Sequence, residues 1–270
     1  MRVISISNHK GGCSKTTVAL NLSVTLAATG SRVLVVDLDP QGNLSAALGI
    51  DLEEMELTKR TSHRLMLDEQ IDYSNFVVTV RPRLDIIPAC LDADAEALLE
   101  AQAVSRELLL KQKLIPAHPA YDYCVIDTPP SLRIPTLNAL AMSHLTIVPI
   151  ESSMFALLGL GQLLRTVAKV RRAHSPDMLV MALSTMYTAR QNLDKTIRSK
   201  ILEKFTEDFV FRTTIPRTVA IGEATATLQA VVEVLPESAA TFAFHQIVAE
   251  IRELFEDEKT SKEVPRRTTR

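Results

Sequence analysis

The sequence has few cysteines, no long apolar run and almost no net charge, and each of these deficits excludes a class of protein. Cys13, Cys90 and Cys124 lie far apart and form no Cys-x-x-Cys pair, which argues against a metal cluster held by one chain and favours a reducing, cytoplasmic setting. No apolar run reaches the roughly 18–20 residues that span a bilayer, and the N-terminus enters a strand-like segment without a signal peptide. The net charge of −2 gives no overall attraction to nucleic acid, so any such surface must be local.

Apolar, β-branched runs alternate with segments of helical period along the chain. This alternation predicts the α/β class, with a doubly wound, mostly parallel sheet and helices on both faces. We read the polar segment 50–76 as helical excursions outside the sheet, residues 1–256 as a single domain, and 257–270 as a polar, flexible tail. The expected strands are 2–7, 33–37, 84–87, 123–127, 145–149, 179–184 and 210–213, and the expected helices lie near 16–29, 92–113, 135–142, 155–174, 192–206 and 239–256.

A loop with two lysines follows the first expected strand, and it lacks both glycines of an ordinary P-loop. The pattern Gly-x4-Gly-Lys-Ser/Thr would need glycine at the positions of His9 and Ser14. A strand, a glycine-containing loop and a helix N-terminus in this order still form a phosphate cradle, because backbone N–H groups and the helix dipole face an anion. Lys15 is suited to reach the β- and γ-phosphates, and Thr16 can offer its hydroxyl to Mg²⁺. Lys10 adds a second positive charge to the loop.

Aspartates end two of the expected strands near this loop. Asp127 follows a buried apolar run and suits a Walker B carboxylate that holds Mg²⁺ through water. Asp39 can orient or deprotonate an attacking water, whereas Asp37 is expected to be structural. Each could instead be a turn residue before a proline, but together with the loop they predict Mg²⁺-dependent nucleoside triphosphate hydrolysis. The expected catalytic groups are Lys10, Lys15 and Asp39, and the expected metal ligands are Thr16, Asp39 and Asp127.

Several ordered blocks make the chain resemble the ParA/MinD family of deviant Walker A ATPases, which have a P-loop NTPase fold. They are Lys10-Gly11-Gly12-x-x-Lys15-Thr16-Thr17, Val36-Asp37-Leu38-Asp39-Pro40-Gln41-Gly42-Asn43 and Asp127-Thr128-Pro129-Pro130-Ser131. Further blocks at 136–140, 157–160, 185–187 and 215–217 look like the Soj-like ParA partition branch, so the resemblance covers about residues 1–255.

The resemblance implies ATP as the nucleotide and a sandwich homodimer that forms on ATP binding. In that dimer Lys10 would reach the partner's phosphates, which couples nucleotide state to dimer state. It further implies non-specific binding to DNA, a ParB-like stimulatory partner, slow intrinsic turnover and a nucleoid-associated location. The residues expected to bind the nucleotide are Lys10, Gly11, Gly12, Cys13, Ser14, Lys15, Thr16, Thr17 and Pro216.

Two departures from the family pattern concern nucleotide and DNA. Ser14 stands where the family usually has glycine, and if its φ is positive the serine costs about 1–2 kcal/mol. Ala220 replaces an arginine that helps relatives contact DNA, so other basic residues would have to compensate. The expected DNA-binding residues are Arg190, Lys195, Arg198, Lys200 and Arg217.

Other readings of the chain remain open. Ser14 also permits a slow or inactive nucleotide-gated adaptor. A MinD-like membrane-cycling ATPase would need a C-terminal amphipathic helix, but the apolar face of 242–256 is followed by acidic residues, so no stable membrane association is expected. A reductase of the nitrogenase iron-protein kind is disfavoured, since no suitable cysteine pair is present. Cys13 is expected to be filler, although a helix N-terminus could lower its pKa.

Overall fold

The computed structural model describes residues 1–69, 72–101, 106–153, 160–206 and 209–263. Within them a seven-stranded sheet has the order β3-β4-β2-β5-β1-β6-β7. β3 pairs antiparallel with β4, and the other neighbouring strands are parallel. This arrangement confirms the predicted fold class. The strands are β1 Arg2–Ile6, β2 Val33–Asp37, β3 Val78–Arg81, β4 Leu84–Ile87, β5 Tyr123–Asp127, β6 Leu145–Glu151 and β7 Leu179–Thr185.

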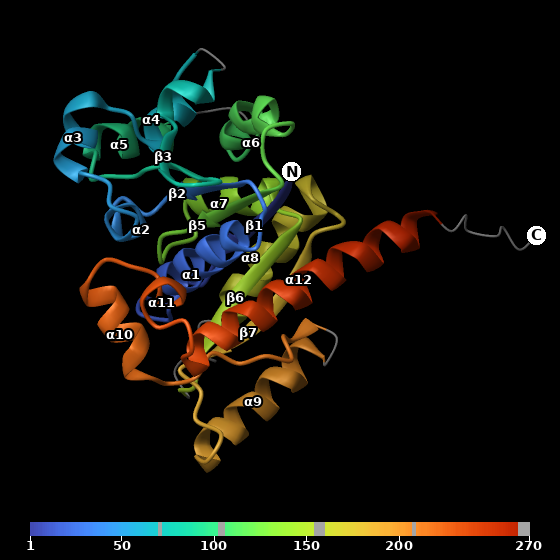
Figure 1. The fold of residues 1–270 in the computed structure, drawn as a ribbon. Coiled ribbons are helices and arrows are strands. Elements are labelled where there is room, and N and C mark those ends of the chain that lie inside the picture. Colours follow the sequence, from blue (N-terminus) through green and yellow to red (C-terminus); the bar gives the residue numbers. More distant parts are fainter. Residues whose placement is uncertain (70–71, 102–105, 154–159, 207–208, 264–270) are drawn as a thin grey trace, which may run out of the picture.

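Helices cover both faces of the sheet (Figure 1). Alternate strand residues face opposite sides: Ile4 packs in the core with α1 and α12, whereas Val3 packs in the core with α6 and α7. Burial on both faces explains why the central strands read as continuous apolar runs. The helices are α1 Lys15–Ala28, α2 Asn43–Ala47, α3 Leu52–Thr58, α4 Ser62–Leu67, α5 Ala93–Ala101, α6 Leu109–Leu114, α7 Ile134–Met142, α8 Leu160–His174, α9 Asn192–Phe205, α10 Val219–Ala226, α11 Val231–Val234 and α12 Ala239–Glu263, with 3₁₀ turns at Tyr73–Phe76 and Ile115–Ala117.

Some predicted boundaries were wrong. The segment 210–213 is not a strand, because Val210 forms only an isolated bridge with Ala182. The helix expected near 92–113 is split into α5 and α6, and β3 was not predicted at all. Residues 155–159 of another expected helix lie outside the described residues.

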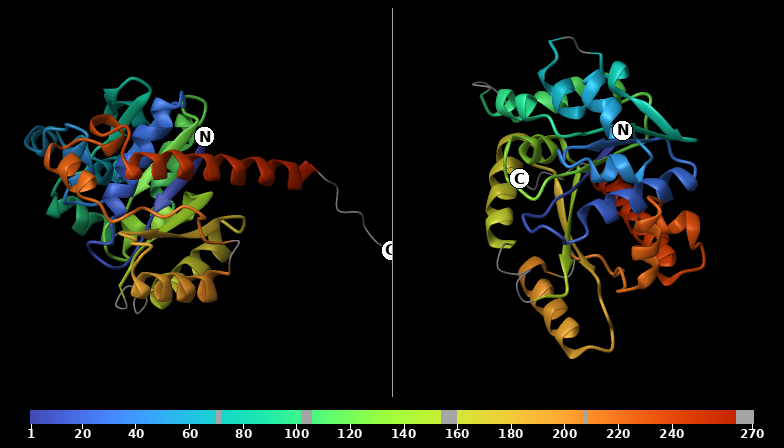
Figure 2. Two further views of the ribbon diagram at one scale, coloured as in Figure 1. Left: turned by 60° about the horizontal axis from the view of Figure 1, so that its bottom comes forward. Right: turned by 90° about the vertical axis from the view of Figure 1, so that its left-hand side faces the viewer.

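The C-terminal helix is longer than expected. It packs along α1 and continues to Glu263, through the first part of the segment expected to be a flexible tail. In Figure 2 its last turns project beyond the body of the molecule. Residues 264–270 lie outside the described part of the chain. Among the described helices, none is both long and apolar enough to cross a membrane.

Candidate functional site

The loop between β1 and α1 forms the predicted cradle, and it bends through two residues with positive φ. Gly12 has φ 73°, and Ser14, which precedes the first residue of α1, has φ 69° and ψ 24°. The Ser14 carbonyl accepts the Val18 N–H at 2.9 Å, while its side chain makes no capping hydrogen bond within the described residues. Ser14 therefore occupies the left-handed conformation that disfavours a Cβ atom, at a cost of about 1–2 kcal/mol.

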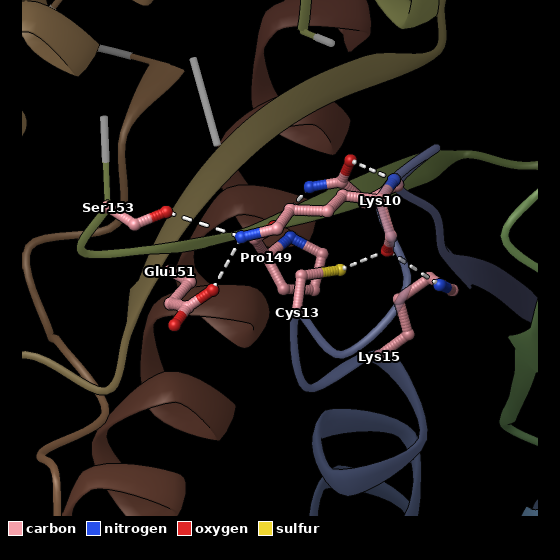
Figure 3. A network of polar contacts seen from close by, with 7 residues as sticks. Lys10, Cys13, Lys15, Pro149, Glu151 and Ser153 are labelled. Atoms are coloured by element: carbon pink, nitrogen blue, oxygen red, sulfur yellow. Dashed lines mark hydrogen bonds and ion pairs between the residues drawn. The ribbon is translucent and has the colours of Figure 1, made fainter. Parts of the chain in front are cut away.

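Lys15 lies inside the cradle. Its side chain is buried, with 7% of the residue exposed, and Nζ donates to the Lys10 carbonyl at 3.3 Å. Cys13 Sγ donates to the same carbonyl at 3.1 Å (Figure 3). Burial raises the pKa of the Cys13 thiol, so the expectation that the helix N-terminus could lower it was wrong. The loop thus holds an inert thiol and one deeply placed ammonium group.

Asp37 and Asp127 are paired in register where β2 and β5 end beside each other. Asp37 accepts the Ser45 N–H at 2.9 Å, the Ser45 hydroxyl at 2.8 Å and the Asp39 N–H at 3.0 Å. Burial raises the pKa of Asp37 to about 6. These contacts give Asp37 the structural role expected for it, since it anchors the start of α2 and the turn that presents Asp39.

Asp127 is buried and only half satisfied. Oδ2 accepts the Thr16 hydroxyl at 2.7 Å, but Oδ1 has no hydrogen-bond partner among the described residues. Burial, followed by the charge of Asp37, raises the pKa of Asp127 well above its usual range. An orphaned carboxylate oxygen beside a threonine hydroxyl is a donor set that fits Mg²⁺, and a cation would offset the cost of the buried charge.

An open cavity of about 390 Å³ brings the predicted residues together. Asp39 lies on its wall, is 8% exposed and accepts the Gln41 N–H at 3.1 Å. Gln41, Asn43, Pro130 and Met186 also line the cavity and were missed as site residues, although all four belong to quoted family blocks. The lining comprises Gly11, Gly12, Ser14, Lys15, Thr16, Thr17, Asp39, Gln41, Asn43, Pro130 and Met186.

Lys10 is not part of that lining. Its Nζ lies 2.7 Å from Glu151 Oε2 and 3.3 Å from Ser153 Oγ. Asn8 holds the same region, because its Oδ1 accepts the Lys10 N–H at 3.1 Å and its Nδ2 donates to the Pro149 carbonyl at 2.6 Å. Figure 3 shows the Lys10 side chain extending toward the end of β6, away from the Lys15 ammonium.

Pro216 lies one residue away from the cavity wall. It forms a bridge with Tyr187, the residue that follows Met186. The Tyr187 N–H donates to the Ile215 carbonyl at 3.0 Å. Pro216 is therefore placed to support the cavity rather than to line it.

The predicted DNA-binding residues fall into two groups. Arg190, Lys195 and Arg217 are exposed, and Lys200 is partly exposed. Arg198 instead donates to the Ser184 hydroxyl and to the carbonyls of Phe211 and Arg212, at 3.2–3.3 Å. These bonds join α9 to the end of β7 and the segment beside it. Ala220, where relatives have arginine, is buried in the first turn of α10.

Comparisons with known proteins agree with this geometry. A family model described as an AAA domain matches residues 1–180. The chain is 38% identical over 224 residues to the sporulation initiation inhibitor protein Soj of Bacillus subtilis, covering 83% of this chain and 87% of that one. It is 38% identical over 227 residues to the chromosome partitioning protein ParA of Caulobacter vibrioides, covering 83% and 84%.

A solved structure extends the similarity to the fold. Cobyrinic acid a,c-diamide synthase from Mycobacterium smegmatis, with a bound ATP analogue and magnesium, has a TM-score of 0.81 and 30% identity to this chain. The match covers 96% of this chain and 97% of that one.

Proposed function

This chain belongs to the ParA/MinD family of deviant Walker A ATPases, in its Soj-like branch, and from that premise we propose that it is a Mg²⁺-dependent ATPase that positions DNA or another large cargo. The observation that carries the proposal is the half-satisfied Asp127 beside Thr16, at the mouth of a cradle that contains Lys15. A phosphate loop without a metal-binding carboxylate would not need this arrangement.

Each residue has a distinct task in ATP hydrolysis. Lys15 and the N–H groups at the start of α1 neutralise the β- and γ-phosphates. Thr16 and Asp127 hold Mg²⁺, which supplies charge stabilisation at the phosphate oxygens. Asp39 lies across the cavity from α1 and orients the attacking water. The solved relative with an ATP analogue and magnesium supports these cofactors.

Dimerisation on ATP completes the site. Lys10 leaves Glu151 and reaches the phosphates of the partner subunit, so that each subunit adds a positive charge to its partner's nucleotide. Charge supplied in this way is present only when two subunits face each other. The nucleotide state is thereby converted into a dimer state.

The ATP-bound dimer binds DNA without sequence preference, and a ParB-like partner stimulates hydrolysis and release. The exposed Arg190, Lys195 and Arg217 support a DNA surface, and the partition relatives support the cargo. On this basis the protein is nucleoid-associated, with no stable attachment to membranes. The name of the solved relative as a diamide synthase adds no cargo, because the partition relatives are more similar in sequence.

The experiment is a DNA-binding titration with ATP, ADP and no nucleotide at several salt concentrations. We expect ATP-dependent binding that Lys15→Ala abolishes and that Lys10→Ala abolishes together with dimerisation. Lys169→Ala, which removes an exposed lysine on α8, is the matched control and should bind as the wild type does. Binding that is absent, or that ignores the nucleotide, would overturn the proposal.

A further inference from the structure

A second cavity of about 430 Å³ lies behind the two loops that carry Asp39 and Asp127. Its walls come from α5 and from residues 129–135, and it shares no lining residue with the phosphate cavity. Pro40 and Pro129 form part of its wall, and Pro40 directly follows Asp39. An occupant of this cavity would therefore touch both loops from the side opposite the nucleotide.

His63 lines this cavity and is the group that most needs a ligand. It is 1% exposed, and neither ring nitrogen has a hydrogen-bond partner in the part of the chain that the structure describes. Burial lowers the pKa of His63 to about 4, so at neutral pH the ring offers one donor and one acceptor. An unsatisfied buried polar group costs about 1–3 kcal/mol, and such a group in a folded protein calls for an explanation.

The position of His63 is fixed by the start of α4. Ser62 Oγ donates to the Asp37 carbonyl at 2.5 Å, and the Ser62 N–H donates to the Pro88 carbonyl at 2.8 Å. Asp92 is charged and near enough to act on His63, but it is committed to Arg64 at 2.7 Å. The imidazole is thus held rigidly and its neighbouring carboxylate is already paired.

The charged groups around the cavity favour a cation. Glu96 and Glu100 both line it from α5, and their i,i+4 spacing places them on one face of that helix. Arg133 contributes the opposite charge at the start of α7. Two carboxylates against one guanidinium leave the lining net negative. Apolar groups, including Leu99, supply walls against which an aliphatic stem can pack.

We propose that this cavity binds the guanidinium group of an arginine side chain presented by a partner protein. A guanidinium has several N–H donors in a planar fork, which suits two carboxylates and the acceptor nitrogen of His63 at once. The remaining N–H of His63 donates to a backbone carbonyl of the same partner segment. A buried arginine in a pocket is a common anchor of protein interfaces. The inference goes beyond ATP hydrolysis and DNA binding, and it does not depend on either.

The test uses the full chain with ¹³C-labelled histidine, without nucleotide or DNA, so that its failure is distinct from failure of the proposed function. The probe is N-acetyl-arginine amide, and the neutral control is the citrulline analogue of the same shape. The His63 signal is assigned from its loss in His63→Asn. We expect a saturable shift of the His63 signal with the arginine probe and none with the citrulline probe.

Variants of the lining charges give opposite expected signs. Glu96→Gln with Glu100→Gln should weaken binding of the arginine probe about tenfold, which corresponds to about 1.4 kcal/mol. Arg133→Gln removes the like charge and should tighten binding. Glu203→Gln with Glu237→Gln makes the same charge change at exposed positions elsewhere and should leave binding unchanged.

Three results would overturn the proposal. They are an equal His63 shift with the citrulline probe, wild-type affinity in the Glu96/Glu100 double variant, and no His63 shift up to the solubility limit of the arginine probe. Backbone amide spectra of each variant establish that a loss of binding is not a loss of fold.

Discussion

Lys10 and Glu151, 141 positions apart in the chain, form an ion pair with their nearest N and O atoms 2.7 Å apart. The pair joins the phosphate loop to the end of β6. Its side chains are 34% and 23% exposed, so solvent screening reduces its strength to about 0.5–1 kcal/mol. The role proposed for Lys10 in the partner's site requires this pair to open.

Glu151→Gln should therefore make ATP-dependent dimerisation easier. Removing the carboxylate charge frees Lys10, and about 0.5–1 kcal/mol corresponds to a two- to fivefold lower ATP concentration at half-dimerisation. Sedimentation velocity across an ATP titration measures this, with Glu203→Gln as the control for a lost surface charge. An unchanged or higher ATP requirement in Glu151→Gln would show that the ion pair does not restrain Lys10.

Ser14→Gly should tighten ATP binding by up to about tenfold. Glycine adopts the observed φ of 69° without strain, and release of about 1–2 kcal/mol becomes available to the loop that contacts phosphate. Ser14→Ala is the matched variant: it keeps the Cβ atom and removes a hydroxyl that makes no capping bond in the described residues, so its affinity should match the wild type. Isothermal titration with ATP and Mg²⁺ distinguishes the two; equal affinities for glycine and serine would mean that the strain is not felt on binding.

Asp127→Asn should stabilise the nucleotide-free protein near neutral pH. Burial raises the pKa of Asp127 in the folded state, so the folded protein binds the proton more tightly than the unfolded chain does. A carboxyl of this kind favours folding below its unfolded pKa, and the contribution is lost as the pH rises through its folded pKa. Asparagine keeps an oxygen for Thr16 and removes the buried charge. The melting temperature in EDTA should rise by a few degrees at pH 7.5, and the gain should shrink as the pH falls.

The same substitution should remove the stabilisation by ATP and Mg²⁺. If Asp127 holds the metal, the wild type gains melting temperature when both are added and Asp127→Asn gains little. A lower melting temperature of the variant in EDTA would contradict the burial argument. Full stabilisation by ATP and Mg²⁺ in the variant would instead contradict its assignment as a metal ligand.

Local patterns in the sequence predicted the central sheet well and the boundaries around it less well. Buried parallel strands read as apolar runs, whereas β3 is a partly exposed edge strand without that signal. The break between α5 and α6 depends on Asn138, whose amide accepts the Leu110 N–H at 2.9 Å and donates to the Arg106 carbonyl at 2.6 Å. A buried side chain on another helix thus satisfies backbone groups near the break, and periodicity contains no trace of it.

The candidate site shows the same division. The loop, Asp39 and Asp127 could be identified because each follows a strand in a recognisable block. The positive φ of Ser14 was a condition that only the backbone could decide. The Lys10–Glu151 pair and the unpartnered ring of His63 arise from contacts between distant segments, which spacing in the sequence does not encode.

Substitutions on α9 should separate DNA contact from structural support. Lys195 is exposed, and if it contacts a phosphate, Lys195→Ala should lower the slope of log affinity against log salt concentration by about 0.9. Arg198 is bonded to Ser184, Phe211 and Arg212, so Arg198→Ala should lower the melting temperature by a few degrees. Its effect on the salt slope should be small. Fluorescence anisotropy with a random-sequence duplex, in ATP and Mg²⁺ at several salt concentrations, measures the slope, and Lys169→Ala is the control. If Arg198→Ala lowers the slope as much as Lys195→Ala and leaves the melting temperature unchanged, then Arg198 is released in the ATP-bound dimer and contacts DNA directly.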